Sequence, residues 1–182
     1  AEVNTSIRPG WFYHASEESL VRSPENLFEL YLTSVGRGST LLLNIPPDRR
    51  GLFHENDVAS LRGFRKILDS VFAENLAEKA TATATPVRGD KPIYAADKVL
   101  DGDAETYWAT NDGVTTGSIE LSWDAPQTLN YISLQEYIKL GQRVAAFTVS
   151  VWEDGAWKEV QNQTTIGHKR ILKLNGVETS KL

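Results

Sequence analysis

A change in the spacing of apolar residues near Ala80 is the feature that most constrains how this chain can fold. Before Ala80, apolar residues recur at helical spacing around one continuous apolar run, whereas after Ala80 they mostly alternate with polar residues. Side chains on a helix repeat about every 3.6 residues and those on a strand about every 2, so the two patterns require different elements. The sequence therefore predicts two unlike domains, residues 1–79 and 80–182.

A helix and a buried strand are predicted in the first half of residues 1–79. Ser23 followed by Pro24 is typical of a helix start, and helical spacing continues until Gly36. The apolar run Thr40–Ile45 is closed by two prolines, which is typical of a strand buried on both faces of a parallel sheet. The order so far is helix, then strand.

A longer helix is predicted from about Asn56 to Ala77, and the aromatic run Ser6–His14 favours a short extended segment. Helix, strand and helix in this order fit the end of a (β/α)₈ barrel or part of a doubly wound sheet. In both architectures ligands lie beyond the carboxyl ends of the strands. This directs attention to Asn44, to the loop Pro46–Gly51 and to Trp11.

Short antiparallel strands are predicted in residues 80–182, where apolar residues alternate with polar ones. The pair Asp154-Gly155 predicts a tight hairpin, because glycine tolerates the positive φ of such turns. Strands separated by turn residues favour a β-sandwich. The alternating residues are Ile119, Leu121, Trp123, Ile132, Leu134, Phe147, Val149 and Val151.

Composition narrows the possible partners. The formal net charge is -5 and no run of Lys or Arg occurs, so we expect no nucleic acid partner. No apolar stretch approaches the roughly 20 residues that span a bilayer, so we expect no membrane span.

Cysteine is absent, which excludes disulfides and thiol chemistry. The chain starts at Ala1 without the pattern of a signal peptide, and we expect the true start of the protein to lie elsewhere.

Several motifs together resemble the family 29 α-L-fucosidases. In the first half these are Glu2, the run Ser6–His14, Ser34-Val35-Gly36, and Leu-Leu-Leu-Asn-Ile-Pro-Pro-Asp at residues 41–48 with Gly51. In the second half, the motifs resemble the factor 5/8 type C (discoidin-like) sandwich that follows the barrel in those enzymes. They are Asp101-Gly102-Asp103, Thr106-Tyr107-Trp108, Gln135-Glu136-Tyr137-Ile138 and Gly141-Gln142-Arg143-Val144.

This resemblance implies an α/β domain joined to an all-β domain. The first would be the C-terminal part of a (β/α)₈ TIM-type barrel, and the second an antiparallel, jelly-roll β-sandwich. The implied activity is that of a retaining exo-α-L-fucosidase that removes terminal, α-1,3/1,4-linked fucose from glycans. The implied partners are a fucosylated glycan and the remainder of the catalytic barrel. No cofactor is implied for catalysis, and the family suggests a periplasmic or secreted protein.

The resemblance also assigns residues. Glu2 would be the acid/base, and the nucleophile would be an Asp on an earlier strand that no residue of this chain matches. A retaining mechanism needs two carboxyl groups about 5–5.5 Å apart, so this chain alone should be inactive. Asp48 is the one residue of this chain that could in principle replace the nucleophile, although Asp after Pro-Pro is typical of a turn. Trp11 would form an apolar wall for fucose, or alternatively be a core residue.

Two questions remain open for the sandwich. Asp101, Asp103 and Thr106 could hold a structural Ca²⁺, as discoidin-like sandwiches often do at the matching loop, or they could form a plain acidic turn. The chain could also be a non-catalytic glycan-binding module attached to a barrel remnant. Its tryptophans would then either stack against sugars or pack in the core. These are Trp108, Trp123, Trp152 and Trp157.

Overall fold

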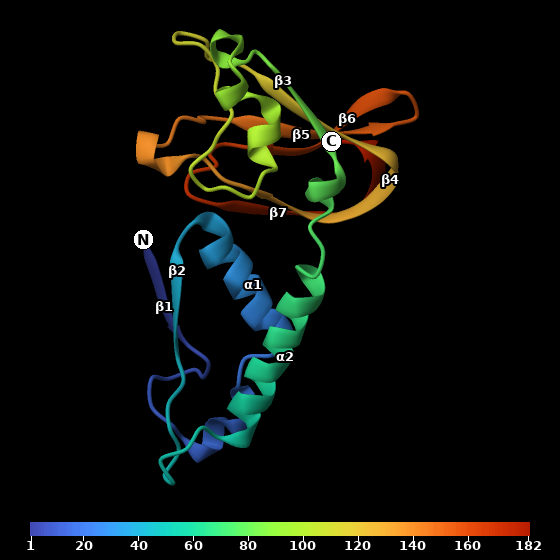
Figure 1. Ribbon diagram of the computed structural model, residues 1–182. Helices are drawn as coiled ribbons and strands as arrows, with labels where there is room; N and C mark the ends of the chain where they lie inside the picture. Colours follow the sequence, from blue (N-terminus) through green and yellow to red (C-terminus); the bar gives the residue numbers. More distant parts are fainter. The chain divides into compact units, whose positions relative to one another are not determined.

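The chain forms two compact units. The computed structural model describes residues 1–182, which divide into an N-terminal unit, Ala1–Glu74, and a C-terminal unit, Asn75–Leu182 (Figure 1). The N-terminal unit contains one pair of strands and two helices, and the C-terminal unit contains five strands. No helix in the chain is both long and apolar enough to span a membrane.

Two parallel strands form the sheet of the N-terminal unit. Strand β1, Glu2–Ser6, runs beside β2, Thr40–Asn44, and the register aligns Ser6 with Asn44. The predicted strand after residue 40 is thus confirmed. The extended segment predicted over Ser6–His14 was placed too late in the chain, because β1 ends where that segment begins. Pro9 follows shortly afterwards and has no N–H with which to continue a strand ladder.

The first helix begins where the sequence predicts. Helix α1 spans Pro24–Ser34, and the Ser23 hydroxyl accepts a hydrogen bond from the backbone N–H of Asn26 at 3.2 Å. This is the standard N-cap arrangement, in which a short polar side chain satisfies a backbone donor that lacks a helical partner. The proline at the first helical position needs no such partner.

The second helix is shorter than predicted. Helix α2 spans Glu55–Val71, so the predicted end at Ala77 was wrong. Asn75 caps a separate turn of 3-10 helix, Leu76–Lys79, through a hydrogen bond to the N–H of Ala77. Because that turn lies in the C-terminal unit, the chain leaves α2 before it.

The two helices approach each other closely at Gly63. A Cβ atom at this position would lie 2.5 Å from Cγ of Pro24, so only glycine fits without displacing the start of α1. An aromatic cluster extends the contact. The ring centroid of Tyr31 lies 6.2 Å from that of Phe64 and 6.0 Å from that of Phe72. The helix pair is therefore held by both a close backbone approach and aromatic packing.

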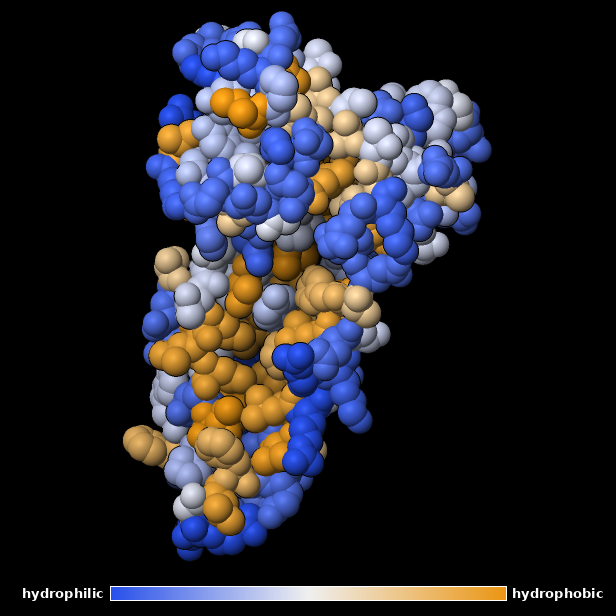
Figure 2. Space-filling view, viewed as in Figure 1, coloured by the Kyte–Doolittle hydropathy of each residue, from blue (hydrophilic) through white to orange (hydrophobic).

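One face of the strand pair is open within this chain. Strand residues alternate between two faces, and Glu2, Asn4 and Leu42 share the face on which the chain packs no other element. Leu42 is 50% exposed, so the predicted burial of β2 on both faces was wrong for this chain. Figure 2 shows hydrophobic side chains gathered on the surface of the N-terminal unit. The large hydrophobic residues of this unit that are exposed are Trp11, Phe12, Leu20, Leu42, Leu52, Phe53 and Phe72.

The C-terminal unit consists of two antiparallel sheets, consistent with the predicted β-sandwich. One sheet has the order β3–β4–β7 and the other pairs β5 with β6. Strand β4 curves strongly (Figure 1) and pairs first with β3 and then with β7, with irregularities in the ladder. The strands are β3, Thr81–Thr85; β4, Ser118–Leu134; β5, Phe147–Glu153; β6, Ala156–Gln163; and β7, Arg170–Lys181.

The predicted hairpin at Asp154-Gly155 is confirmed. These two residues join β5 to β6 and have φ angles of 54° and 80°. Positive φ at both central positions is the geometry of a type I′ turn, which matches the right-handed twist of the strands it joins.

The core of the C-terminal unit is built around Trp123, Leu129 and Leu174, all less than 9% exposed. Leu76 packs against this core, and its carbonyl accepts a hydrogen bond from Nε1 of Trp123 at 2.9 Å. The indole therefore buries its ring while its only donor is satisfied. The turn Leu76–Lys79 is consequently part of the packing of this unit.

A single buried hydroxyl links β5 to β7. Thr179 is 2% exposed, and its Oγ1 donates to the carbonyl of Trp152 at 2.9 Å or of Lys181 at 2.7 Å. The same oxygen accepts from the N–H groups of Trp152 and Lys181. Because the two strands share no backbone ladder, this hydroxyl supplies backbone groups of Trp152 and Lys181 with hydrogen bonds that the sheets do not provide.

We expect Thr179→Val to destabilise the chain by about 1–3 kcal/mol, because it keeps the side-chain volume but leaves those backbone groups unsatisfied. Urea unfolding of the 182-residue chain measures the effect. Thr148→Val, at an exposed position on β5, is the matched control and should change the free energy of unfolding by less than about 0.5 kcal/mol. Equal effects of the two substitutions would contradict the role given to Thr179.

Candidate functional site

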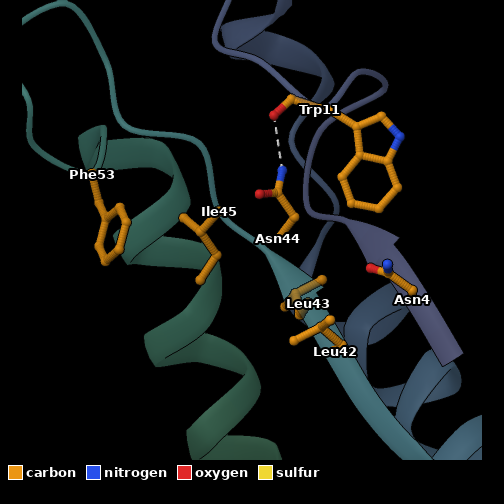
Figure 3. A pocket seen from close by; sticks show the side chains of 7 residues that line it. All are labelled: Asn4, Trp11, Leu42, Leu43, Asn44, Ile45 and Phe53. Atoms are coloured by element: carbon orange, nitrogen blue, oxygen red, sulfur yellow. Dashed lines mark hydrogen bonds between the residues drawn. The ribbon is translucent and has the colours of Figure 1, made fainter. Parts of the chain in front are cut away.

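The carboxyl ends of β1 and β2 meet at one edge of the N-terminal unit, because the two strands are parallel. The backbone N–H of Ile7 donates to the carbonyl of Asn44 at 3.0 Å, which fixes this edge just beyond the strands. A pocket of about 440 Å³ lies here. Figure 3 shows its lining side chains, which are Asn4, Trp11, Leu42, Leu43, Asn44, Ile45 and Phe53.

Trp11 lies on the surface of this pocket. The residue is 52% exposed, so it is not a core residue beneath the loop. Its backbone carbonyl accepts a hydrogen bond from Nδ2 of Asn44 at 3.0 Å (Figure 3). The pocket therefore combines an exposed indole and aliphatic side chains with two carboxamides, Asn4 and Asn44. Apolar walls with a few polar groups are typical of sites for small polar ligands.

A buried ion pair anchors the segment that carries Trp11. Nε of Arg8 donates to both carboxylate oxygens of Asp57, each at 3.1 Å, and both side chains are fully buried. The ring of Tyr13 lies 4.9 Å from the guanidinium carbon of Arg8. The phenol of Tyr13 donates to Glu18 at 2.6 Å, and this hydrogen bond raises the pKa of the phenol. Trp11 thus lies between two anchored residues.

Glu2 lies at the opposite end of β1 from the pocket edge. It shares a strand face with Asn4, but it does not line the pocket. Glu2 lies four positions before Ser6, which corresponds to about 13 Å along a strand. The structure gives the side chain of Glu2 no hydrogen bond or ion pair, and Glu2 is exposed. The acid/base role therefore stays a prediction from the resemblance.

Asp48 holds the loop after β2. Its carboxylate accepts hydrogen bonds from the backbone N–H of Arg50 at 2.7 Å and from Nη2 of Arg50 at 2.6 Å. It also accepts from the N–H of Leu52 at 3.4 Å. The side-chain hydrogen bond from Arg50 is the main cause that lowers the pKa of Asp48, and the backbone N–H groups add to it. Asp48 is therefore a turn residue whose carboxylate is fully engaged.

The residues predicted to hold calcium lie together in the C-terminal unit. Oγ1 of Thr106 is 2.7 Å from Oδ2 of Asp101 and 3.2 Å from the carbonyl of Asp103. It is also 3.4 Å from the carbonyl of Lys98. One hydroxyl proton cannot be donated to all of these acceptors at once, so several oxygen atoms crowd around Thr106 Oγ1.

This oxygen cluster has the donor chemistry of a calcium site, since Ca²⁺ takes carboxylate, carbonyl and hydroxyl oxygens. Hydrogen bonds from Asp103 N–H and Thr106 lower the pKa of Asp101, which keeps this carboxyl ionised. The ammonium of Lys98 lies 3.5 Å from Asp101, so one positive charge already contacts the cluster. The chain has no group of three or more His, Cys, Asp or Glu side chains that could hold a metal. These residues could therefore hold calcium only if backbone carbonyl oxygens also serve as ligands.

The four sandwich tryptophans have different environments. Trp123 is in the core, and Nε1 of Trp108 donates to the carbonyl of Pro86 at 3.0 Å. Trp152 and Trp157 form an edge-to-face pair across the β5–β6 hairpin, with ring centroids 5.4 Å apart. Trp157 is the most exposed of the four, at 45%. The four rings therefore do not form one stacking platform.

Sequence reasoning missed Asn4, Phe53 and the pair Arg8 and Asp57. Asn4 could have been found from strand alternation, had β1 been placed before Ser6. Phe53 follows the Pro-Pro turn in a stretch without periodicity, so no sequence signal marked it. The two charges of the ion pair are 49 positions apart in sequence, and nothing local links them.

Comparison with known proteins gives two kinds of match. The family model described as F5/8 type C domain matches residues 79–180. A protein of Arabidopsis thaliana named α-L-fucosidase 1 is 37% identical over 186 residues, which covers 100% of this chain and 36% of the relative. A rice protein of similar name is 38% identical over 180 residues. The chain spans about a third of the length of the curated relatives it matches.

Solved structures agree with these matches. The crystal structure of SpGH29 has a TM-score of 0.90 and 40% identity, covering 99% of this chain and 39% of that one. A GH29 fucosidase of Ruminococcus gnavus in complex with fucose has a TM-score of 0.90 and 30% identity, covering 99% and 36%. A chitosan-binding module of a Paenibacillus chitosanase/glucanase has a TM-score of 0.51 and 26% identity, covering 59% and 80%.

We expect Asp48→Asn to lower the melting temperature at pH 7 and to have a smaller effect in acid. The folded state depresses the pKa of Asp48, so its contribution is fully present above the ordinary Asp value of about 3.9. That contribution is lost as the pH falls through the lower folded value. Thermal melts from pH 7 to pH 2.5 test this.

Asp69→Asn is the control, because Asp69 forms an exposed ion pair with Arg65. It should change the melting temperature little at any pH. A loss of stability in Asp48→Asn that is as large at pH 2.5 as at pH 7 would contradict the electrostatic role of Asp48.

Proposed function

Because residues 79–180 of the chain belong to the F5/8 type C domain family and the whole chain is homologous to GH29 α-L-fucosidases, we propose that it is the C-terminal part of a retaining exo-α-L-fucosidase. The substrate would be terminal α-L-fucose, α-1,3/1,4-linked on a glycan. The observation that carries this proposal is the pocket at the carboxyl ends of β1 and β2, with Trp11 exposed on its wall.

The open face of the strand pair supports a larger barrel. Parallel strands occur almost only in sheets that are covered on both faces. In this chain, however, Leu42 is 50% exposed on the face that it shares with Asn4. In a closed barrel this face would point inward and be filled by side chains of other strands. We therefore propose that the N-terminal unit is the C-terminal portion of a (β/α)₈ barrel, whose remaining strands also provide the nucleophile.

Three of the pocket residues would contact the sugar in this proposal. The indole of Trp11 would pack against the apolar face and methyl group of fucose, and Phe53 would extend that apolar wall. The carboxamide of Asn4 would exchange hydrogen bonds with sugar hydroxyls. These contacts orient the sugar, and the two carboxyl groups of a retaining glycosidase carry out the chemistry.

Glu2 is our proposal for the acid/base on the basis of the motif that follows it. The group must first protonate the leaving oxygen and then activate water from the same side of the sugar. Its place at the amino end of β1 demands a direct test, because active-site residues of barrels lie at the carboxyl ends of strands.

We expect Glu2→Gln in the complete protein to hydrolyse a chromogenic α-L-fucoside about 10²–10⁴-fold more slowly, because proton transfer is lost. Azide should restore turnover and yield fucosyl azide, since azide attacks without a general base. Trp11→Ala should hydrolyse the fucoside more slowly than the wild type at every azide concentration, because azide cannot replace the lost indole against which the sugar packs. Glu29→Gln, at an exposed position on α1, is the matched control and should behave as wild type.

Wild-type rates in Glu2→Gln together with a defect in Trp11→Ala would contradict the acid/base assignment while leaving the sugar site in place. Wild-type rates in both variants would contradict the site itself.

A glycan-binding role of the sandwich is the second candidate function. The similarity of the C-terminal unit to a module named as chitosan-binding favours it. Under this proposal the N-terminal unit would not contact sugar, and a glycan would lie on residues 75–182. The two functions therefore predict different contact residues for the same ligand.

We further propose a structural Ca²⁺ in the C-terminal unit, held by Asp101, by Thr106 and by the carbonyls of Asp103 and Lys98. The crowding of these oxygens around one hydroxyl supports this site. Bound calcium would bridge these oxygens and would fix the loop. It would take no part in fucoside cleavage.

We expect Ca²⁺ to raise the free energy of unfolding of the chain by about 2.7 kcal/mol when its free concentration is 100-fold above Kd. Thr106→Val and Asp101→Asn should abolish this increase, whereas Asp124→Asn should keep it. Melting curves in Ca²⁺ and in EDTA measure the effect. An unchanged melting temperature of the wild-type chain in Ca²⁺ would contradict the site.

A further inference from the structure

We propose that Asn44 is a positioning residue, whose side-chain amide holds the Trp11 segment in place at the pocket. The kinetic part of this inference rests on the proposed fucosidase function, whereas its structural part does not. Asn44 is the last residue of β2, at the strand end where ligand sites of parallel sheets lie.

Two hydrogen bonds carry the inference. Nδ2 of Asn44 donates to the carbonyl of Trp11 at 3.0 Å and to Oγ of Ser6 at 3.2 Å. A backbone carbonyl can only accept, so the orientation of the amide is fixed: nitrogen faces Trp11, and oxygen does not. Both donors of one amide are thereby used, one on the last residue of β1 and one on the segment that follows it.

The strand register places Asn44 where it can do this. Ser6 is its partner across the parallel pair, and the backbone N–H of Ile7 donates to the Asn44 carbonyl. Asn44 therefore contacts Ile7, just beyond β1, through its backbone, and Ser6 and Trp11 through its side chain. In Figure 3 the amide nitrogen points along the dashed line to Trp11, and the amide oxygen is turned away from it.

Little else near Trp11 fixes its backbone on the pocket side. The residue is 52% exposed and Phe12 is 79% exposed, so packing restrains neither strongly. Arg8 is anchored to Asp57 before them, and Tyr13 to Glu18 after them. Asn44 supplies the hydrogen bond between these two anchors, at the residue whose indole forms the wall.

Asn44→Asp is the informative substitution. It keeps the size of the side chain and its acceptor oxygen, but it removes both N–H donors and sets a carboxylate against the Trp11 carbonyl. Asn4→Asp is the matched control, because Asn4 lines the same pocket on the neighbouring strand, and the structure gives its side chain no hydrogen bond to the Trp11 segment. Both variants carry the same added charge.

A double-mutant cycle on the complete protein tests how Asn44 acts. We expect Asn44→Asp to lower kcat/KM for an α-L-fucoside about tenfold, as the loss of a positioning hydrogen bond should. In the Trp11→Ala background the same substitution should lower kcat/KM less than about twofold, because the wall that it positions is already gone. A tenfold loss in both backgrounds would show direct contact with the sugar and overturn the inference.

Fluorine NMR of the 182-residue chain labelled with 5-fluorotryptophan gives a second readout that needs no activity. The five tryptophans give separate signals, and Trp11→Phe assigns the one from Trp11. We expect Asn44→Asp to move the Trp11 signal toward that of free 5-fluorotryptophan and to leave the other four in place. Asn4→Asp should not move the Trp11 signal in this direction.

The two readouts separate the possible failures. An unmoved Trp11 signal in Asn44→Asp would overturn the positioning role, whether or not the protein cleaves fucosides. Absence of fucoside cleavage by the wild-type protein would contradict the proposed function, and the NMR result would then decide the positioning role by itself.

Discussion

The arrangement of the N-terminal unit depends on the buried ion pair between Arg8 and Asp57. Both side chains are fully buried, so neither charge is solvated by water. Removing one partner of such a pair typically costs about 3–5 kcal/mol, because the other charge is left buried and uncompensated. The pair joins the segment after β1 to the first turn of α2. A buried carboxylate in that turn is also favoured by the positive end of the helix dipole.

This pair determines where the chain can go after β1. Arg8 is turned inward, Pro9 cannot extend the strand, and the following residues must therefore leave the sheet at its carboxyl edge. Trp11 consequently lies beside the end of β2, where Asn44 meets its carbonyl. The ion pair thus determines the path of the segment after β1, and the Asn44 amide determines where the indole of Trp11 lies at the pocket.

Features with local causes could be predicted from the sequence. The cap at Ser23, strand β2 and the Asp154-Gly155 hairpin each depend on the conformational preferences of a few adjacent residues. The end of α2 and the place of β1 depend on contacts of other parts of the chain, and both were predicted wrongly. Leu42 has the pattern of a buried strand residue, and its exposure reflects the lack of a covering element within this chain.

The candidate sites show the same division. Sequence motifs pointed to Trp11 and to Asp101, Asp103 and Thr106, and the structure brings the last three together. The carbonyl of Lys98 could not be foreseen, because a backbone oxygen has no signature in a sequence. Asn44 was marked by its place at the carboxyl end of a predicted strand, where ligands of parallel sheets lie, and not by any contact. Its two hydrogen bonds follow from a strand register that pairs residues 38 positions apart.

We propose that a fucosylated ligand contacts the carboxyl edge of β1 and β2 rather than the sandwich. Photo-crosslinking of the complete protein with an α-L-fucoside that carries a diazirine tests this proposal. We expect mass spectrometry to find the label on peptides containing Trp11 or Phe53, and free fucose to compete for it. Competed label found only within residues 75–182 would contradict this proposal and favour a glycan-binding sandwich.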